Sequence, residues 1–171
     1  MRVTIQKVQY ANCVVDNQLV NEINNGYMLL IGFTHNDSIT NVEKACKKIA
    51  NLRIFEDEFG KMNLSIKDVN GSILAISQFT LYADSKKGNR PSFVESMEPQ
   101  KANELYLKMI EILNNEYNIV TKGGQFGAHM MVDLTKKYLK PNGNWASDNA
   151  RFAAYTWNDG GEYVFRVNFL S

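Results

Sequence analysis

Polar and hydrophobic residues alternate at the start of the chain, a pattern typical of a short strand. Val3, Ile5 and Val8 are its apolar positions, and polar residues separate them. Two apolar stretches then flank a polar run at residues 16–18, which indicates a hairpin turn between two strands. The chain is therefore predicted to begin with antiparallel sheet.

Longer apolar runs predict the strands at the centre of the fold. Residues 27–33 are apolar without alternation, so we expect this strand to be covered on both faces. The run at 73–81 begins apolar and ends polar, which predicts a strand whose end opens into polar residues. Weak alternation at 128–134 and clear alternation at 162–170 predict two further strands.

Two segments have the spacing of amphipathic helices. Apolar residues recur every three or four positions from 42 to 52, and Thr40 and Glu43 have the spacing of a capping box. Pro99 suits the first turn of a second helix that runs toward Glu116. Strands interrupted by two helices predict an α+β fold, in which one largely antiparallel sheet or barrel curls over the helices. We interpret residues 1–171 as a single domain.

Composition and charge exclude several classes of protein. The 171 residues are 44% hydrophobic, and 19 basic against 18 acidic residues give a net charge of +1. This balance argues against a sequence-independent coat on nucleic acid, which depends on excess positive charge. No stretch approaches the roughly 18 apolar residues of a membrane span, and no signal peptide is evident, so we expect a cytosolic protein. Cys13 and Cys46 lie far apart and indicate neither a disulfide framework nor a zinc site.

Few residues offer catalytic chemistry. The sequence has no nucleophile elbow, phosphate-binding loop, dinucleotide fingerprint or zinc-protease motif. His35 and His129 are the two histidines, too few for a metal centre built from several imidazoles. We interpret His35 as a surface turn residue. His129 either acts as an acid or base, faces solvent, or fills a polar niche of the core.

The end of the strand at 73–81 is the strongest candidate for a site. Ser77-Gln78-Phe79-Thr80 places two hydroxyls and an amide within four residues. Ester hydrolysis needs hydrogen-bond donors aimed at a developing oxyanion, and the backbone N–H groups of Phe79 and Thr80 are suited to this. The structural alternative is a strand that simply ends with Thr80 bonded to a neighbouring carbonyl.

This string resembles the Ser-Gln-Phe-Thr-Leu signature of the D-aminoacyl-tRNA deacylase family, also known as D-tyrosyl-tRNA deacylases. Other segments agree with the family in order and spacing, and together they span residues 1 to about 135. They are residues 1–8, Asn51-Leu52-Arg53-Ile54-Phe55-Glu56-Asp57-Glu58, Gly60-Lys61-Met62-Asn63, Lys87-Gly88-Asn89-Arg90-Pro91-Ser92-Phe93 and Gly124-Gln125-Phe126-Gly127-Ala128.

The resemblance implies a hydrolase acting on carboxylic ester bonds. The family's substrate is the 3′ end of an aminoacyl-tRNA, from which a D-amino acid or glycine is released. The resemblance further implies a homodimer without metal or organic cofactor in the cytoplasm, and we expect neither membrane nor DNA as a partner. The nearest alternatives are a relative that hydrolyses another acyl-tRNA or acyl ester, and a non-catalytic module that binds tRNA or a protein partner.

The resemblance also implies roles for individual residues. Thr80 has been proposed as the family's nucleophile, whereas the rival mechanism has water attack with help from the ribose 2′-hydroxyl. No His or Lys stands next to Thr80 to activate it, so we favour the second route, with Thr80 in a positioning role. The residues expected to line the pocket are Ser77, Gln78, Phe79 and Thr80, with Phe126, Ala128 and Met130 on the opposite wall; Lys86, Lys87 and Arg90 are expected to contact tRNA phosphates.

The sequence departs from the family near its end. The family's second signature contains a cis Gly-Pro that excludes L-amino acids, and Gly160-Gly161 stands in the closest matching string here. Lys7 stands where the family typically has an arginine that braces this loop, and lysine lacks the planar fork of arginine. Residues 136–157 resemble an insertion ahead of this string. Their aromatic residues either cover a sheet edge or contact the substrate.

Overall fold

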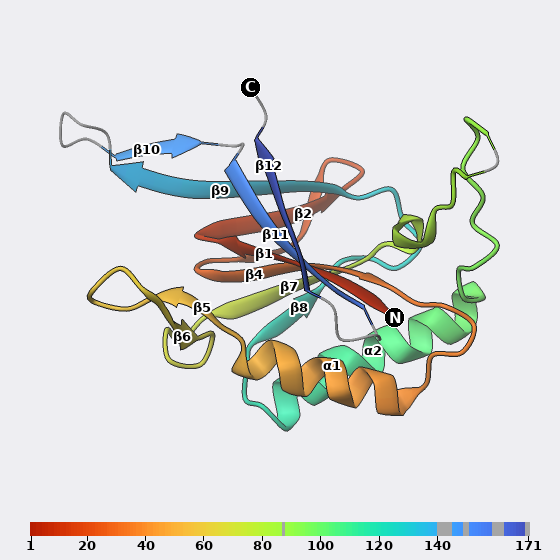
Figure 1. Ribbon diagram of the computed structural model, residues 1–171, viewed down its shortest axis with the longest axis horizontal. Helices are drawn as coiled ribbons and strands as arrows, with labels where there is room; N and C mark the ends of the chain where they lie inside the picture. Colours follow the sequence, from red (N-terminus) through yellow and green to blue (C-terminus); the bar gives the residue numbers. More distant parts are fainter. Residues whose placement is uncertain (87, 140–144, 149–150, 159–162, 170–171) are drawn as a thin grey trace.

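A six-stranded sheet forms the centre of the molecule. The computed structural model describes residues 1–86, 88–139, 145–148, 151–158 and 163–169. The strand order of the sheet is β12-β11-β1-β4-β7-β8 (Figure 1). Its strands are β1 (Arg2–Val8), β4 (Gly26–Gly32), β7 (Ser72–Ser77), β8 (Thr121–Gly123), β11 (Arg151–Asn158) and β12 (Tyr163–Phe169).

β4 is a central strand with apolar residues on both faces, as its unbroken apolar run predicted. Tyr27, Leu29 and Ile31 point into the core shared with the helices, whereas Met28 and Leu30 face a second apolar cluster. β4 pairs antiparallel with β1 and parallel with β7. Burial on both sides explains why this strand shows no alternation.

A second sheet packs over the face of the first that the helices leave open. Its strand order is β10-β9-β2-β3, from β2 (Tyr10–Val15), β3 (Gln18–Ile23), β9 (Met131–Leu139) and β10 (Trp145–Asp148). Asp16 and Asn17 both have positive φ, 49° and 61°. Two such residues suit the tight hairpin turn predicted between β2 and β3. Between the two sheets lies a smaller core that includes Cys13, Leu74 and Ile76.

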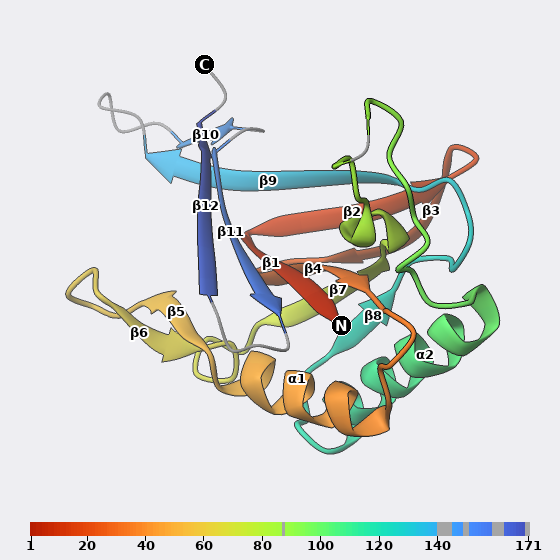
Figure 2. The same ribbon diagram turned by 45° about the vertical axis from the view of Figure 1, so that its right-hand side comes forward.

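Two helices cover the other face of the six-stranded sheet (Figure 2). They are α1 (Ile39–Asn51) and α2 (Pro99–Asn115). Their buried residues join the apolar side chains of the sheet in the main core, which confirms the predicted α+β fold with two helices. The sheets are mainly antiparallel, and the parallel pairs β4–β7 and β7–β8 were not predicted.

The N-cap residue of α1 lies two residues before the predicted one, so the assignment of Thr40 and Glu43 as a capping box was wrong. Ser38 is the N-cap residue, with extended backbone angles. The Oδ1 atom of Asn41 accepts hydrogen bonds from the Ser38 amide and from Ser38 Oγ, both at 2.9 Å. Asn41 therefore takes the role that Glu43 was expected to have.

Three other segments refine the predictions. β5 (Arg53–Glu56) and β6 (Met62–Ser65) form a separate hairpin around the expected turn at residues 57–60. The predicted strand at 128–134 begins only at Met131. The segment 136–157, interpreted as an insertion, contains the end of β9, all of β10 and most of β11. β11 pairs antiparallel with β1 and so adds to that side of the central sheet.

Candidate active site

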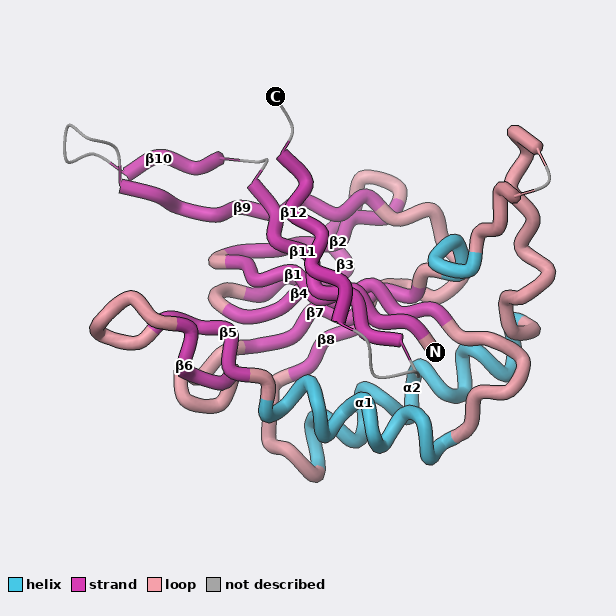
Figure 3. Tube along the Cα trace, viewed as in Figure 1, coloured by secondary structure: helices cyan, strands magenta, loops and turns pink. Residues whose placement is uncertain are grey.

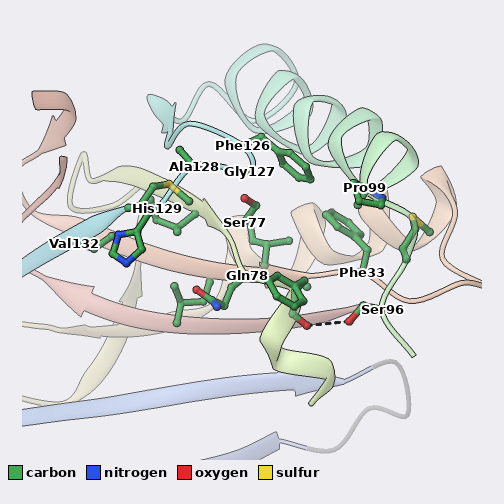
Figure 4. Close-up of a pocket in the computed structure, with 18 of the residues that line it drawn as sticks. Phe33, Ser77, Gln78, Ser96, Pro99, Phe126, Gly127, Ala128, His129 and Val132 are labelled. Atoms are coloured by element: carbon green, nitrogen blue, oxygen red, sulfur yellow. Dashed lines mark hydrogen bonds between the residues drawn. The ribbon is translucent and has the colours of Figure 1, made fainter. Parts of the chain in front are cut away.

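A cavity of about 890 Å³ lies where β7 ends and the two sheets separate. Most of the residues around it are apolar, and a few polar groups interrupt them (Figure 4). In this view His129 and Val132 lie at one end of the cavity and Pro99 at the other. Ser77 and Gln78 lie between them, at the end of β7.

The polar strand end lies in the wall of this cavity, and its backbone changes direction there. β7 stops at Ser77, and Phe79–Tyr82 form the short 3₁₀ helix η1 instead of continuing the strand as predicted for 73–81. The backbone N–H of Gln78 donates to the Ile31 carbonyl at 2.7 Å, and this bond holds the turn against β4. Ser77, Gln78 and Phe79 line the cavity.

Two backbone N–H groups remain available at this turn. Within the described part of the chain, the amides of Phe79 and Thr80 donate to no other group. They are the first amides of η1, and a helix start leaves such donors without an intrahelical acceptor. A pair of adjacent donors of this kind is suited to binding an anionic oxygen.

Thr80 is exposed and does not line the cavity. Its Oγ1 accepts a hydrogen bond from Nε2 of Gln78, so its hydroxyl fixes the orientation of a side chain that does line the cavity. The structural alternative, in which Thr80 bonds to a neighbouring carbonyl, is not the contact seen here.

The opposite wall consists of residues 126–130, all of which line the cavity. It includes Phe126, Ala128 and Met130, the three residues expected there. His129 also belongs to it and is exposed, which excludes the niche in the core. His35, by contrast, contacts the Val94 carbonyl at the surface, as expected for a turn residue.

A long loop between η1 and α2 supplies site residues that the sequence did not reveal (Figure 3). The ring of Phe93 packs edge-on against Phe79, with 5.0 Å between the ring centroids. Ser96 Oγ donates to the Phe79 carbonyl at 3.1 Å and thereby braces η1. Phe93 lies within a matched family segment, which was the only signal for it, whereas nothing in the pattern marked Ser96.

Lys86 and Arg90, two of the basic residues of this loop, lie outside the cavity. Lys86 and Arg90 are exposed, and the Lys86 amide donates to Asp84 Oδ1 at 2.9 Å. Lys87 is outside the described residues. The loop therefore presents Lys86 and Arg90 to solvent, and its aromatic and hydroxyl groups contribute to the cavity wall.

Glu98 and His129 are the titratable side chains among the residues that line the cavity. Glu98 caps α2, because its carboxylate accepts from the amides of Gln100 and Lys101 at 2.9 and 3.1 Å. These bonds lower the pKa of the Glu98 carboxyl. The site is thus largely uncharged, and its one carboxylate already serves the fold.

The described part of the chain offers no metal cluster, and both of its thiols are buried. No three His, Cys, Asp or Glu side chains there are grouped so as to hold a metal ion. Cys13 and Cys46 are free and buried, and burial raises the pKa of the Cys46 thiol to about 12. No described helix combines the length and apolar character of a bilayer crossing.

Comparison with known proteins agrees with this arrangement. Residues 4–137 match the sequence model of the D-Tyr-tRNA(Tyr) deacylase family, which is most of the chain. The chain belongs to this family. A D-aminoacyl-tRNA deacylase of Fusobacterium nucleatum is 54% identical over 134 residues, which are 78% of this chain and 88% of that protein. Another, from Lactobacillus gasseri, is 53% identical over 135 residues, 78% of this chain and 92% of that protein.

Two solved structures have a fold similar to that of this deacylase family member. The structure of a c-Myc DNA unwinding element binding protein has a TM-score of 0.74 and 32% identity, and the match covers 88% of this chain and 99% of that one. A probable eukaryotic D-amino acid tRNA deacylase has a TM-score of 0.69. Its identity of 14%, over 86% of this chain and 98% of that one, shows the fold alone.

The residues in which this deacylase family member departs from the usual pattern lie away from the cavity or outside the described residues. Lys7 does not line the cavity; its Nζ lies 3.4 Å from Glu56 Oε1 and 5.8 Å from the centre of the Phe55 ring. The structure therefore ties Lys7 to the β5–β6 hairpin. Gly160 and Gly161 are outside the described residues.

Proposed function

We propose that this chain hydrolyses the ester bond of D-aminoacyl-tRNA and releases a free D-amino acid and tRNA. The observation that carries the proposal is the pair of available amides, Phe79 and Thr80, at the polar edge of an apolar cavity. The relatives named as D-aminoacyl-tRNA deacylases support the same reaction. Glycyl-tRNA is a second expected substrate.

In the proposed mechanism the substrate's ester carbonyl points its oxygen at the Phe79 and Thr80 amides. Water attacks the carbonyl carbon, and the negative charge that develops on the carbonyl oxygen is stabilised by these two donors. The intermediate collapses by breaking the bond between the carbonyl carbon and the ribose oxygen, and the leaving ribose oxygen takes up the proton that the attacking water has given up. The neighbouring ribose 2′-hydroxyl assists the attack, since no described side chain next to Thr80 is a general base.

Other parts of the chain complete the proposal. Phe126, Ala128 and Met130 form the wall that faces the ester, and Lys86, Lys87 and Arg90 contact phosphates of the acceptor end. Two copies of the chain associate, as the resemblance implies, and light scattering of the purified protein tests this with an expected mass twice that of the chain. The enzyme acts in the cytoplasm, where charged tRNA is used.

The changed string around Gly160 and Gly161 gives the enzyme a weaker preference for D-substrates in this proposal. A cis bond without proline costs about 2.5–4 kcal/mol, whereas one before proline costs about 0.5–1 kcal/mol. A rigid cis filter is therefore harder to form from Gly-Gly than from Gly-Pro. The variant Gly161→Pro introduces the missing dipeptide and is expected to raise the ratio of D- to L-turnover, while an unchanged ratio would count against this explanation.

Hydrolysis of matched D-tyrosyl- and L-tyrosyl-tRNA, with glycyl-tRNA alongside, tests the proposed function. Release of the amino acid from D-tyrosyl-tRNA at a rate well above spontaneous hydrolysis is the expected result. Turnover of another acyl-tRNA without any of D-tyrosyl-tRNA would indicate the alternative ester substrate. Binding of tRNA without turnover of any substrate would indicate a non-catalytic module.

A further inference from the structure

Tyr106 is a buried residue of α2 whose hydroxyl contacts the backbone next to both walls of the cavity. The residue itself does not line the cavity. Its side chain is only 1% exposed, and it is a polar member of the otherwise apolar face of the helix. Its Oη donates to the Ala75 carbonyl at 2.8 Å and lies 3.4 Å from the Gly124 carbonyl. Burial raises its pKa to about 12, so the hydroxyl stays a neutral donor at any physiological pH.

The two carbonyls that Tyr106 contacts stand just before the two walls. Ala75 precedes Ser77 by two residues on β7, and Gly124 precedes Phe126 by two residues after β8. The Gly124 amide also donates to the Ala75 carbonyl at 2.9 Å. Tyr106 thus belongs to a small network of hydrogen bonds and contacts. This network fixes the start of the 126–130 wall, just after β8, against β7, the strand that ends at Ser77.

Two glycines lie so close to neighbouring side chains that an added Cβ atom would force those side chains to move. A Cβ atom on Gly123 would lie 2.8 Å from Tyr106 Oη and 2.9 Å from Ile110 Cδ1. A Cβ atom on Gly124 would lie 2.9 Å from Ile76 Cδ1, on the strand that ends at the site. The Tyr106 ring itself packs against Phe126, with ring centroids 5.8 Å apart. Close packing and hydrogen bonding together therefore set the distance between the walls.

We propose that Tyr106 is a positioning residue that holds the 126–130 wall at the correct distance from the Ser77–Phe79 turn. The proposal rests on the proposed function, because the distance matters only for a substrate held between these walls. Without the hydroxyl, Ala75 keeps its bond from Gly124, so the sheet survives. The Gly124 carbonyl loses its contact with Tyr106 Oη, and the wall is free to shift.

The variant Tyr106→Phe tests this directly. A small displacement of a catalytic wall is expected to lower kcat for D-tyrosyl-tRNA by about tenfold and to change KM by less than about twofold. The matched control is Asn114→Ala on the same helix. Asn114 bonds to the backbone N–H and carbonyl of Thr121, at the far end of β8, and does not contact the walls.

A second variant separates positioning from a general loss of stability. Gly123→Ala is expected to lower kcat as well, because its methyl group would press on Tyr106 Oη. The double variant Gly123→Ala with Tyr106→Phe should be no slower than Tyr106→Phe alone. With the hydroxyl gone, the added methyl group lies 3.6 Å from ring atom Cζ, which is ordinary contact. Ile110 Cδ1, 2.9 Å from the methyl group, is the end of a flexible side chain and must rotate away in the single and the double variant alike.

Hydrogen exchange supplies a measurement that does not need activity. The amides of residues 124–130 should exchange faster in Tyr106→Phe than in the wild type, and at wild-type rates in Asn114→Ala. Equal losses of kcat in Tyr106→Phe and Asn114→Ala, or wild-type kcat and exchange in Tyr106→Phe, would overturn the proposal. If the wild type cleaves no acyl-tRNA, the proposed function fails, and the exchange rates alone then decide whether Tyr106 positions the wall.

Discussion

At the scale of single residues, the site depends more on backbone donors than on reactive side chains. The cavity has one histidine and one carboxylate in its lining, and the carboxylate, Glu98, is committed to a helix cap. The Phe79 and Thr80 backbone amides, in contrast, are fixed by the turn into η1. Ordering them costs no side-chain conformational entropy. A chain with such a site tolerates side-chain changes that would abolish catalysis by a nucleophile.

The role of Thr80 follows from this difference. We expect Thr80→Ala to lower kcat by about tenfold, because Gln78 loses its partner while both amides remain. Loss of a true nucleophile costs far more, on the order of 10⁶-fold in a well-studied protease. Single-turnover hydrolysis of D-tyrosyl-tRNA measures the effect, and Thr80→Ser should retain nearly full activity.

The exposed Thr40 on α1 provides the control for that substitution, since Thr40→Ala removes the same atoms far from the site in sequence. Its kcat should equal that of the wild type. A fall of 10⁴-fold or more in Thr80→Ala, with the fold intact, would show that Thr80 attacks the ester itself.

At the scale of elements, strands and helices were predictable where burial leaves a periodic trace. The unbroken apolar run of β4 and the three-to-four spacing in α1 and α2 each reflect which faces are covered. The parallel pairing of β4, β7 and β8 leaves no such trace, because strand order depends on contacts far apart in the sequence. Ser96 was missed for the same reason: its role comes from a loop that returns to η1 across 17 residues.

The start of α1 shows how local ambiguity is resolved by one contact. Ser38 and Thr40 are both good N-cap residues, so the sequence alone does not separate them. The structure favours Ser38, because Asn41 accepts from both its amide and its hydroxyl. Which residue caps the helix is therefore decided by the residue at the third helical position.

This assignment predicts opposite effects of two similar substitutions. Ser38→Ala should lower the free energy of unfolding by about 1 kcal/mol, the usual cost of losing a cap. Thr40→Ala should leave it unchanged or raise it by a few tenths of a kcal/mol, because alanine is the better helix former at an exposed position. Urea denaturation of both variants measures the difference, and a larger loss from Thr40→Ala would restore the original capping box.

At the scale of the whole molecule, the two sheets and the helices enclose separate cores that meet at the cavity. The helices bury the main core against one face of the central sheet, and the second sheet buries a smaller core against the other. The cavity draws its lining from both sheets and from the loop after η1. The positions of the cavity walls therefore depend on the stability of the whole fold, including the turns and helix caps at the surface of the molecule.

Three of those surface features depend on ionised carboxylates and predict how stability changes with pH. Hydrogen bonds lower the pKa of Asp57 in the β5–β6 turn, of Asp68 after β6, and of Glu98 at the start of α2. For Asp57 the largest contribution comes from the Lys61 amide, and for Asp68 it comes from the Ser65 hydroxyl. A carboxyl whose pKa is lower in the folded state binds its proton more readily in the unfolded state.

Their contribution to stability is therefore fully present above the ordinary pKa of these groups, 3.8 for aspartate and 4.5 for glutamate, and is lost as the pH falls below it. Urea denaturation should show a constant free energy of unfolding from pH 7 to about 5 and a progressive decline below that. Asp57→Asn is the sharpest test, because the amide cannot ionise. It should be less stable than the wild type at pH 7, and the two should converge as the pH falls through the lowered pKa of Asp57, because the wild-type carboxyl then loses its charge too. A difference that stays constant down to pH 2 would show that Asp57 stabilises the turn by its shape alone, without its charge.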